Sequence, residues 1–595
     1  MTGPFFHDWS ATQYHWLLTN RLHLKRRTAS CSVIAFRFVA KPGLFAPFRF
    51  KRAAKVPAIG PLLLIRIVTL LGLLLYGSEF GVAQDEKELP AESVMGRICQ
   101  SLQNATVRIL SQNDRSSGVI VSEAGHVLTV AHGLHGDSTK AVIVFHDGSK
   151  ATAEIILRDK NLDVAVLRFT DDAERPRLIP IPIALTNSLQ KEAMVLAAGY
   201  PGREPDGLSP VVRLGKLLAV EPTTLRSSCT LTAGDSGGPL VNHRGQLIGL
   251  HRQIGLSRES NHHLPLQRVE EAVKSAVNLQ KLAAADSSTP NTLTTTLPTA
   301  NLAVTETLRL RSVEIHQAEV SPQDDVAPRV IGTLLDVDHV ATKLSELTPN
   351  APIGCRFDGG DHSDAEISAS DVLLDLAILK LKNPRSATTS LALQTVDSAR
   401  AFSPVFAGTI QSEPLRVGLI ARRHHHEPQL RGKLGAVLEV DESSRAVRVK
   451  DVAPNSTASE AGLVKNSLID SMNDQPAATL DDVAALLMKH QPGDWLQFHL
   501  RTGEQASTSF ARLRHDPAEQ FERTEFLDGR SGMISERRSG FADVIQHDIE
   551  LLPSDCGGPL FDSKGFVVGV NIARRARESS LAIPIEVVLQ MLKSE

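Results

Sequence analysis

The sequence contains few cysteines. Among its 595 residues there are only five, Cys31, Cys99, Cys229, Cys355 and Cys556, and no two of them form a CxxC pair. A structural zinc site or a dense disulfide framework needs closely spaced cysteines, so neither is indicated. One disulfide stays open in an oxidising compartment, but the spacing does not say which cysteines would pair. We therefore expect no bound metal and no cofactor.

Outside the N-terminal segment the chain carries no net positive charge. The whole chain has a net charge of −3, yet residues 1–66 hold eleven Lys and Arg and one acidic residue, which leaves about −13 for the rest. A nucleic-acid-binding protein needs a basic surface to neutralise phosphates. We expect no nucleic-acid partner.

The chain also lacks a long hydrophobic run. Ile67–Tyr76 is apolar but short for a membrane span. It follows the basic residues and precedes Gly81, Val82 and Ala83, which supply the small residues of a cleavage site. We interpret residues 1–83 as a basic leader and signal peptide of an exported, periplasmic or extracytoplasmic protein. An uncleaved anchor formed by Pro61–Tyr76 is the alternative.

The second half of the chain repeats the first. Each half contains three similar motifs in the same order, which indicates a duplication. Between the motifs, short runs of β-branched residues alternate with Gly and Asp-Gly turns, so a mainly β fold is expected. The pairs are GVIVSEAGHVLTVAHGL (118–134) with GTLLDVDHVATKLSEL (332–347), LDVAVLRF (162–169) with LDLAILKL (374–381), and GDSGGPLVNHRGQLIGL (234–250) with SDCGGPLFDSKGFVVGV (554–570).

The spacing of the motifs predicts an insertion in the second copy. Asp163 and Ser236 are 73 positions apart, whereas their counterparts Asp375 and Cys556 are 181 apart. A Ser/Thr/Pro/Ala-rich segment separates the two copies and is predicted to be a linker. The expected organisation is a first copy at 84–282, a linker at 283–307, a second copy at 308–430 and 514–595, and an insert at 431–513.

The insert resembles a PDZ domain. The resemblance rests on the segment VKDVAPNSTASEAGLVKNSLIDSMND, on a predicted helix over Leu480–His490, and on the loop and strand RGKLGAVLEV. In such domains a peptide C-terminus adds to a sheet edge and backbone N–H groups bind its carboxylate. The resemblance implies that peptide C-termini are partners, with a purely structural spacer as the alternative. The implied contacts are Leu434, Gly435, Ala436 and Val437.

The first copy contains the residue types that a serine nucleophile needs. His132 ends an apolar strand in LTVAHGL, Asp163 opens DVAVLRF, and Ser236 lies in GDSGGP, where glycines allow a tight turn. Serine catalysis requires a base, a carboxylate that orients the base, and N–H donors for the oxyanion. The order His, Asp, Ser and the spacing predict a catalytic triad.

On these motifs the first copy resembles trypsin-like serine proteases, and with the attached PDZ-like segment it is similar to the HtrA/Deg group. The resemblance implies a fold of two trypsin-like double β-barrel domains, the second interrupted by the insert. It also implies a serine endopeptidase without a cofactor, with His132 as base, Asp163 as its orienter, Ser236 as nucleophile, and N–H groups of Gly234 and Ser236 as the oxyanion hole. Polypeptides, in particular unfolded or damaged ones, are the implied substrates, and a homo-oligomer is compatible with the family.

The second copy has lost key residues. Ser345 stands where the first copy has His132, Cys556 replaces Ser236, and Ser554 replaces Gly234. A cysteine nucleophile still needs a base or a cation to form its thiolate. We favour a non-catalytic domain over a cysteine protease or a redox-sensitive thiol.

Alternatives remain open on three points: metal binding, the substrate pocket and the function of the chain. The histidines of RRHHHEPQ (422–429) and His262-His263 are interpreted as solvated loops rather than metal sites. His251 and Arg252 are unusually large for the expected wall of the substrate pocket. A peptide-binding or scaffold protein with weak or no proteolysis is the alternative function.

Overall fold

The computed structural model describes residues 94–170, 176–184, 189–202, 208–255, 257, 259–277, 296–299, 302–317, 329–385, 400–408, 415–515 and 534–594. The chain divides into two compact units, Met1–Glu86 and Lys87–Glu595, and the described residues all belong to the second. The predicted leader and signal peptide (1–83) and the greater part of the predicted linker lie outside the described residues. No helix within them is long and apolar enough to cross a membrane.

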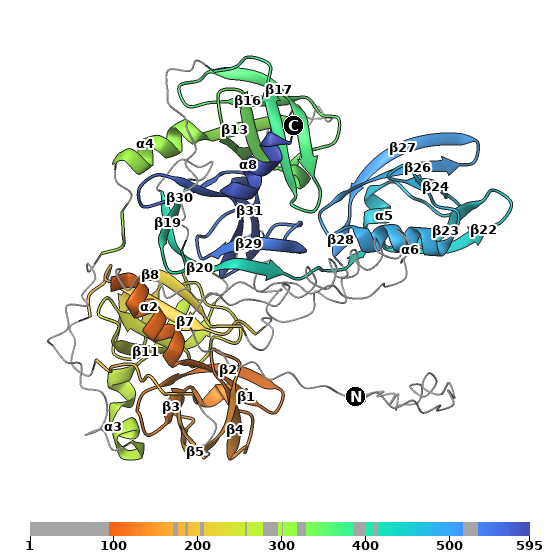
Figure 1. Ribbon diagram of the computed structural model, residues 1–595. Helices are drawn as coiled ribbons and strands as arrows, with labels where there is room; N and C mark the ends of the chain where they lie inside the picture. Colours follow the sequence, from red (N-terminus) through yellow and green to blue (C-terminus); the bar gives the residue numbers. More distant parts are fainter. Residues whose placement is uncertain are drawn as a thin grey trace, which may run out of the picture. The chain divides into compact units, whose positions relative to one another are not determined.

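The first copy begins with a closed six-stranded antiparallel barrel (Figure 1). Inward-facing apolar residues such as Val107, Ile109 and Val127 fill it, because successive side chains of a strand point to opposite faces. Its strand order is β1 (Thr106–Ser111), β2 (Asp114–Ile120), β3 (His126–Thr129), β6 (Val164–Phe169), β5 (Lys150–Asp159) and β4 (Lys140–Val144).

A second closed barrel follows. The helices α2 (Val94–Ala105) and α3 (Leu266–Ala276) contribute Leu102 and Val269 to the same apolar cluster as this barrel's Leu196 and Leu250. We call residues 94–277 the first barrel pair. The strand order of the second barrel is β7 (Met194–Gly199), β8 (Val211–Val220), β9 (Leu225–Ser227), β12 (Asn261–Pro265), β11 (Leu247–Ile254) and β10 (Pro239–Asn242).

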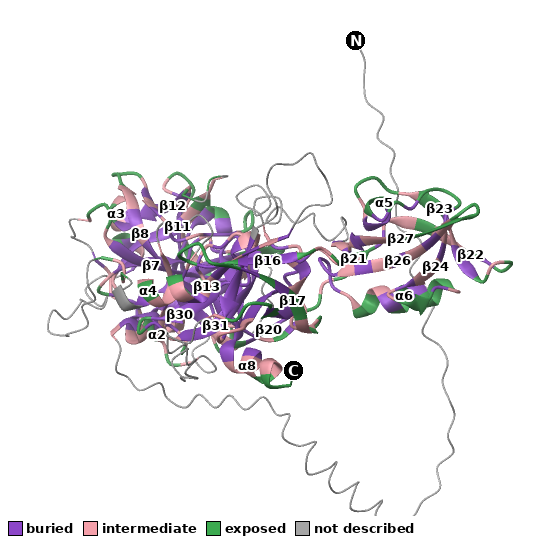
Figure 2. Cartoon of the chain, turned by 90° about the horizontal axis from the view of Figure 1, so that it is seen from above, coloured by how far each residue is buried: buried purple, intermediate pink, exposed green. Residues whose placement is uncertain are grey.

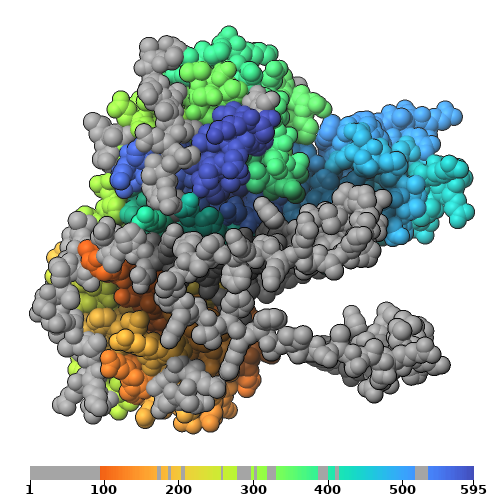
Figure 3. Space-filling model, viewed as in Figure 1, coloured from red at the N-terminus to blue at the C-terminus, as the bar shows by residue number. Residues whose placement is uncertain are grey.

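The second copy repeats this architecture, and we call its residues 302–427 and 534–594 the second barrel pair. The helix α4 (Leu302–Arg311) precedes it and begins before the predicted end of the linker at 307. Helix α8 (Ile585–Lys593) buries one side, and its other side lies at the surface (dark blue in Figure 3). One barrel runs β13 (Ser312–Gln317), β14 (Arg329–Leu334), β15 (His339–Lys343), β18 (Leu376–Leu381), β17 (His362–Asp371), β16 (Ile353–Arg356); the other runs β19 (Pro404–Ala407), β20 (Arg416–Glu427), β29 (Phe541–His547), β32 (Ser579–Pro584), β31 (Val567–Ala576), β30 (Pro559–Asp562).

The insert has its own core. Its entry strand β21 (Gly432–Lys433) pairs with its exit strand β28 (Arg514–His515), so the segment leaves and rejoins the barrel at one place. The predicted helix is present as α6 (Leu480–Lys489), and Figure 2 shows its exposed outer face in green. The other elements are β22 (Ala436–Asp441), β23 (Ala446–Val452), α5 (Thr457–Glu460), β24 (Leu468–Met472), β25 (Gln475–Pro476), β26 (Trp495–Thr502) and β27 (Gln505–Arg512).

The registers confirm the predicted correspondence of the two copies. His126 begins β3 and pairs with Arg168 of β6, and His339 begins β15 and pairs with Lys380 of β18. The expectation that the histidine clusters lie in loops is wrong. His424, His425 and His426 lie on β20, and His262 and His263 lie on β12, because strand pairing satisfies the backbone of both segments.

Candidate active site

His132 lies in a short 3₁₀ turn, η1 (Ala131–Gly133), directly after β3. Its Nδ1 is 3.0 Å from both carboxylate oxygens of Asp163, and its backbone N–H donates to Asp163 Oδ1 at 3.1 Å. On the other side of the ring, Nε2 is 3.2 Å from Ser236 Oγ. Almost half of the His132 side chain is exposed, so the three predicted residues meet at an open surface.

Asp163 stands at the start of β6 with a φ of 59°, an uncommon backbone angle for a residue other than glycine. Burial alone raises the pKa of its carboxyl. The hydrogen bonds and charge of His132, together with the hydrogen bond from Arg252, outweigh burial, and the pKa lies below its usual value. Asp163 is therefore held as an anion against the His132 ring.

Ser236 comes from the other barrel of the first pair, in the loop before β10. Gly234 has a φ of +96°, and a Cβ there would lie 2.5 Å from the backbone of Tyr200 and Gly202. The loop needs glycine at this position. Among the described residues no acceptor takes the N–H of Gly234 or of Ser236, so both donors remain available to a ligand.

The two large residues of β11 have different surroundings. His251 is fully buried, with its Nδ1 3.0 Å from Nδ1 of His263, and burial lowers its pKa well below the usual value. Arg252 instead reaches the triad, and its Nε lies 3.0 Å from Asp163 Oδ2. The expectation that both residues shape the wall of the substrate pocket stays a prediction.

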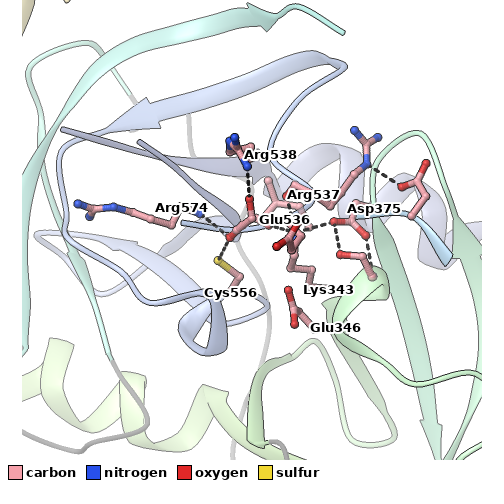
Figure 4. Close-up of polar contacts among 12 residues, drawn as sticks. Lys343, Glu346, Asp375, Glu536, Arg537, Arg538, Cys556 and Arg574 are labelled. Atoms are coloured by element: carbon pink, nitrogen blue, oxygen red, sulfur yellow. Dashed lines mark hydrogen bonds and ion pairs between the residues drawn. The ribbon is translucent and has the colours of Figure 1, made fainter. Parts of the chain in front are cut away.

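In the second barrel pair, a buried lysine lies against Asp375, the counterpart of Asp163 (Figure 4). Lys343, which replaces Val130 of the first copy, places Nζ 2.6 Å from Asp375 Oδ2 and 2.8 Å from the carbonyl oxygens of Arg537 and Ile572. Ser345 Oγ donates to the same carboxylate at 3.0 Å. The retained Asp375 therefore neutralises a buried cation and does not orient an imidazole.

Cys556 is buried beside this network. Its Sγ lies 3.7 Å from Ser535 Oγ and from the carbonyl oxygen of Leu552. Burial raises the pKa of the thiol to about 12, although Lys343 opposes the shift. Ser554 lies in a 3₁₀ turn, η4 (Pro553–Asp555), and has no positive φ. The thiol stays protonated, and the loop no longer has the conformation set by Gly234.

The predicted peptide contacts lie at one edge of the insert's sheet. Leu434 is buried in the core, and its carbonyl accepts the N–H of Ala458. Gly435 has a φ of +74°, and a Cβ there would lie 2.3 Å from the Ser456 side chain. Ala436 and Val437 belong to β22, which has only β23 as a neighbour in the sheet, and Val437 is exposed. The edge of β22 is open.

One acidic group outside the active site could offer metal ligands. The side chains of Asp336, Asp338 and His339 bring ligand atoms within 4.8 Å of one another, the only such group among the described residues. His339 Nδ1 is 3.0 Å from Asp336, so the three groups already satisfy one another.

Sequence reasoning did not identify the partners of the site. Arg213 lies in an apolar strand, and its guanidinium forms a buried ion pair with Asp235, the residue before Ser236. Lys343 ends β15 (HVATK), whose last four residues are buried. In both cases the sequence places a cationic residue within a segment that becomes buried. Because a buried charge is costly without a partner, each of these residues could have been expected to form an ion pair.

Comparison with known proteins agrees with this geometry. Residues 116–250 match the model of the trypsin-like peptidase domain family. The chain is 32% identical over 149 residues to the probable periplasmic serine endoprotease DegP-like of Chlamydia trachomatis, covering 24% of this chain and 28% of that relative. It is 31% identical over 146 residues to the protein of the same name from Halomonas elongata, covering 23% and 29%.

Among solved structures, the serine endoprotease from Yersinia pestis matches 72% of this chain and 100% of its own, with 16% identity and a TM-score of 0.28. The chain spans less than a third of the length of the two sequence relatives. The similarity to each of them covers about a quarter of this chain.

Proposed function

We propose that this chain, whose residues 116–250 are a trypsin-like peptidase domain of the DegP/HtrA type, is a serine endopeptidase with one active site, in the first barrel pair. The observation that carries the proposal is the continuous contact from Asp163 through His132 to Ser236, at 3.0 and 3.2 Å. Among the residues that the structure describes, no comparable chain of contacts surrounds Cys556.

The geometry supports acyl transfer. Nε2 of His132 takes the proton from Ser236 Oγ as the oxygen attacks a peptide carbonyl, and Asp163 stabilises the imidazolium that forms. The N–H groups of Gly234 and Ser236 bind the developing oxyanion. His132 then returns the proton to the leaving amine, and water hydrolyses the acyl-enzyme by the same sequence in reverse. The residues themselves supply every group that the reaction needs.

The insert would serve as a PDZ domain that binds substrate C-termini. An extended peptide adds to the open edge of β22, and the loop at Leu434 and Gly435 presents backbone N–H groups to the carboxylate. Val437 on β22 and Leu480 on α6 are exposed, so they offer apolar contacts to the peptide. Unfolded or damaged polypeptides, which expose such ends, are the proposed substrates, and export from the cytoplasm is proposed with them.

A second candidate is a peptide-binding protein with weak proteolysis. The contact of Arg252 with Asp163 favours it. The Arg252 guanidinium interacts with the same carboxylate that orients His132, so this carboxylate stabilises a protonated His132 ring less. The two candidates differ in the reactivity of Ser236 Oγ.

The deciding experiment treats the purified chain with a fluorophosphonate, which forms a covalent bond only with an activated serine. We expect labelling of the wild type and of Cys556→Ala, the matched change at the equivalent position of the second copy. Ser236→Ala should abolish labelling together with casein cleavage. An unlabelled wild-type protein would contradict the endopeptidase and leave the peptide-binding protein.

A further inference from the structure

The loop that carries Ser236 is held from behind by a buried ion pair. Arg213 of β8 donates to the carboxylate of Asp235 at 2.8 and 3.3 Å, and each side chain is only 1% exposed. The N–H of Thr232 donates to Asp235 Oδ2 at 2.8 Å. Breaking a buried pair leaves an uncompensated charge, so its geometry is strongly enforced. The position of Ser236 therefore depends on where β8 holds Arg213.

The second barrel pair fixes β8 at this point. Asp548, just after β29, accepts the N–H of Leu214 at 2.6 Å through Oδ2 and the N–H of Leu419 on β20 at 2.6 Å through Oδ1. Leu214 is the neighbour of Arg213 in the chain. One carboxylate thus joins β8 and β20, which lie side by side (Figure 1).

A second contact joins the second barrel pair to the turn between β11 and β12. Arg577, at the turn between β31 and β32, is 2% exposed and donates to the carbonyl oxygens of Gly255 and Ser257 at 2.8 and 2.9 Å. These carbonyls lie between β11 and β12. Strand β11 in turn contacts the loop that carries Ser236, because the N–H of Gly237 donates to the carbonyl oxygen of His251 at 2.7 Å.

The interface pairs equivalent elements of the two copies. β8 and β20 hold the same place in their barrels, and so do the β11–β12 and β31–β32 turns. Such an arrangement is that of an isologous dimer within one chain. The residue equivalent to Asp548 is Ser228, whose Oγ accepts the N–H of Lys216, in its own barrel, at 3.0 Å, and no second N–H of the described residues donates to it. The side chain of Asp548 is longer than that of Ser228, and it therefore bonds both to its own barrel and to β8 of the first barrel pair.

We propose that the second barrel pair is a built-in partner of the active site, with Asp548 and Arg577 as positioning residues that hold the Ser236 loop through β8 and β11. The proposal rests on the proposed endopeptidase function of Ser236. It gives the copy that has lost its own triad a role in the reaction of the other copy.

The test compares Asp548→Asn and Arg577→Ala with the wild type in the full chain. Asp562→Asn is the matched control, because Asp562 also accepts backbone N–H groups, from Lys564 and Phe566, but within its own turn. A misplaced nucleophile costs kcat, so we expect about a tenfold loss in kcat and in the fluorophosphonate labelling rate for both variants. KM for a short peptide should stay within about twofold, as in the control.

Hydrogen exchange separates this inference from the proposed function. The amides of Gly237 and Gly238, bonded to His251 and Asp235, should exchange faster in both variants than in the control, whether or not the protein cleaves peptides. Folded variants with wild-type kcat and wild-type exchange in this loop would overturn the proposal. If Asp548→Asn fails to fold, Arg577→Ala decides by the same measurements. A wild type that is not labelled refutes the endopeptidase, and the exchange comparison still decides whether the loop is held.

Discussion

Nε of Arg252 lies 3.0 Å from Oδ2 of Asp163, the carboxylate that faces Nδ1 of His132. The Asp163 carboxylate is thus contacted both by the His132 ring and by the Arg252 guanidinium. Arg252 also donates a hydrogen bond that fixes the carboxylate.

Replacing Arg252 by Gln should move the pH profile of activity. The hydrogen bond from Arg252 is one of the interactions that hold the pKa of Asp163 below its usual value, so without it that pKa rises and the acidic limb of kcat/KM should shift upward. Arg252→Lys, which keeps the charge, should shift it less. Arg268→Gln, at a surface arginine of α3, is the control. Identical limbs in Arg252→Gln and the wild type would show that Arg252 does not act on the charge of Asp163.

Removing the Lys343 ammonium should destabilise the second barrel pair. Lys343→Ala leaves Asp375 buried without its cation, and the loss of one partner of such a pair costs about 3–5 kcal/mol. Chemical unfolding measures the effect. Lys380→Ala, at an exposed position of β18, should change stability by less than about 0.5 kcal/mol. Equal effects of the two substitutions would mean that the buried pair is not required.

Cys556 should be unreactive in the folded protein. With its pKa raised to about 12 by burial, the thiolate is almost absent at pH 8, so a maleimide or disulfide reagent should modify Cys556 only after unfolding. Peptide mapping with and without denaturant identifies the modified residue. Modification of Cys556 under native conditions would revive the redox-sensitive thiol as a function of the second copy.

Stability should fall as the pH rises through about 6, partly because of Asp494. Burial raises its pKa from 3.8 to about 6, although Arg537 and His490 favour the anion, while Asp375 opposes it. The folded state therefore binds this proton more tightly than the unfolded chain. The stabilisation is complete below pH 3.8 and is lost above about 6. Asp494→Asn should reduce the difference in unfolding free energy between pH 5 and pH 8, and an unchanged difference would refute the assignment.

A change at Gly435 should weaken peptide binding by the insert. A methyl group there meets the Ser456 side chain, and the left-handed backbone angle is strained for alanine. We expect Gly435→Ala to lower the affinity for a peptide with a free C-terminus by about tenfold in fluorescence anisotropy. Val464→Ala, at an exposed position outside the proposed groove, serves as the control. Equal binding of a C-terminally amidated peptide would contradict recognition of the carboxylate.

Motif order identified the three residues of the candidate active site. His132, Asp163 and Ser236 lie in segments whose local sequence already fixes a strand end or a glycine turn, and the structure brings all three together. The duplication and the helix that begins at Leu480 were predictable because they too depend on local sequence patterns. The histidines at 424–426 were misassigned because polar residues on a strand resemble a loop when the pairing strand β29 is more than a hundred positions away.

The sequence by itself determined the repeated β fold, the place of the insert and the three residues of the candidate triad, because each depends on local patterns and their spacing. Only the tertiary structure decided what surrounds them. Arg252 on Asp163, Lys343 on Asp375 and Asp548 on β8 are contacts between residues 89, 32 and 334 positions apart. Each depends on burial and on the distance between a donor and an acceptor, and neither quantity exists until the barrels have formed and packed.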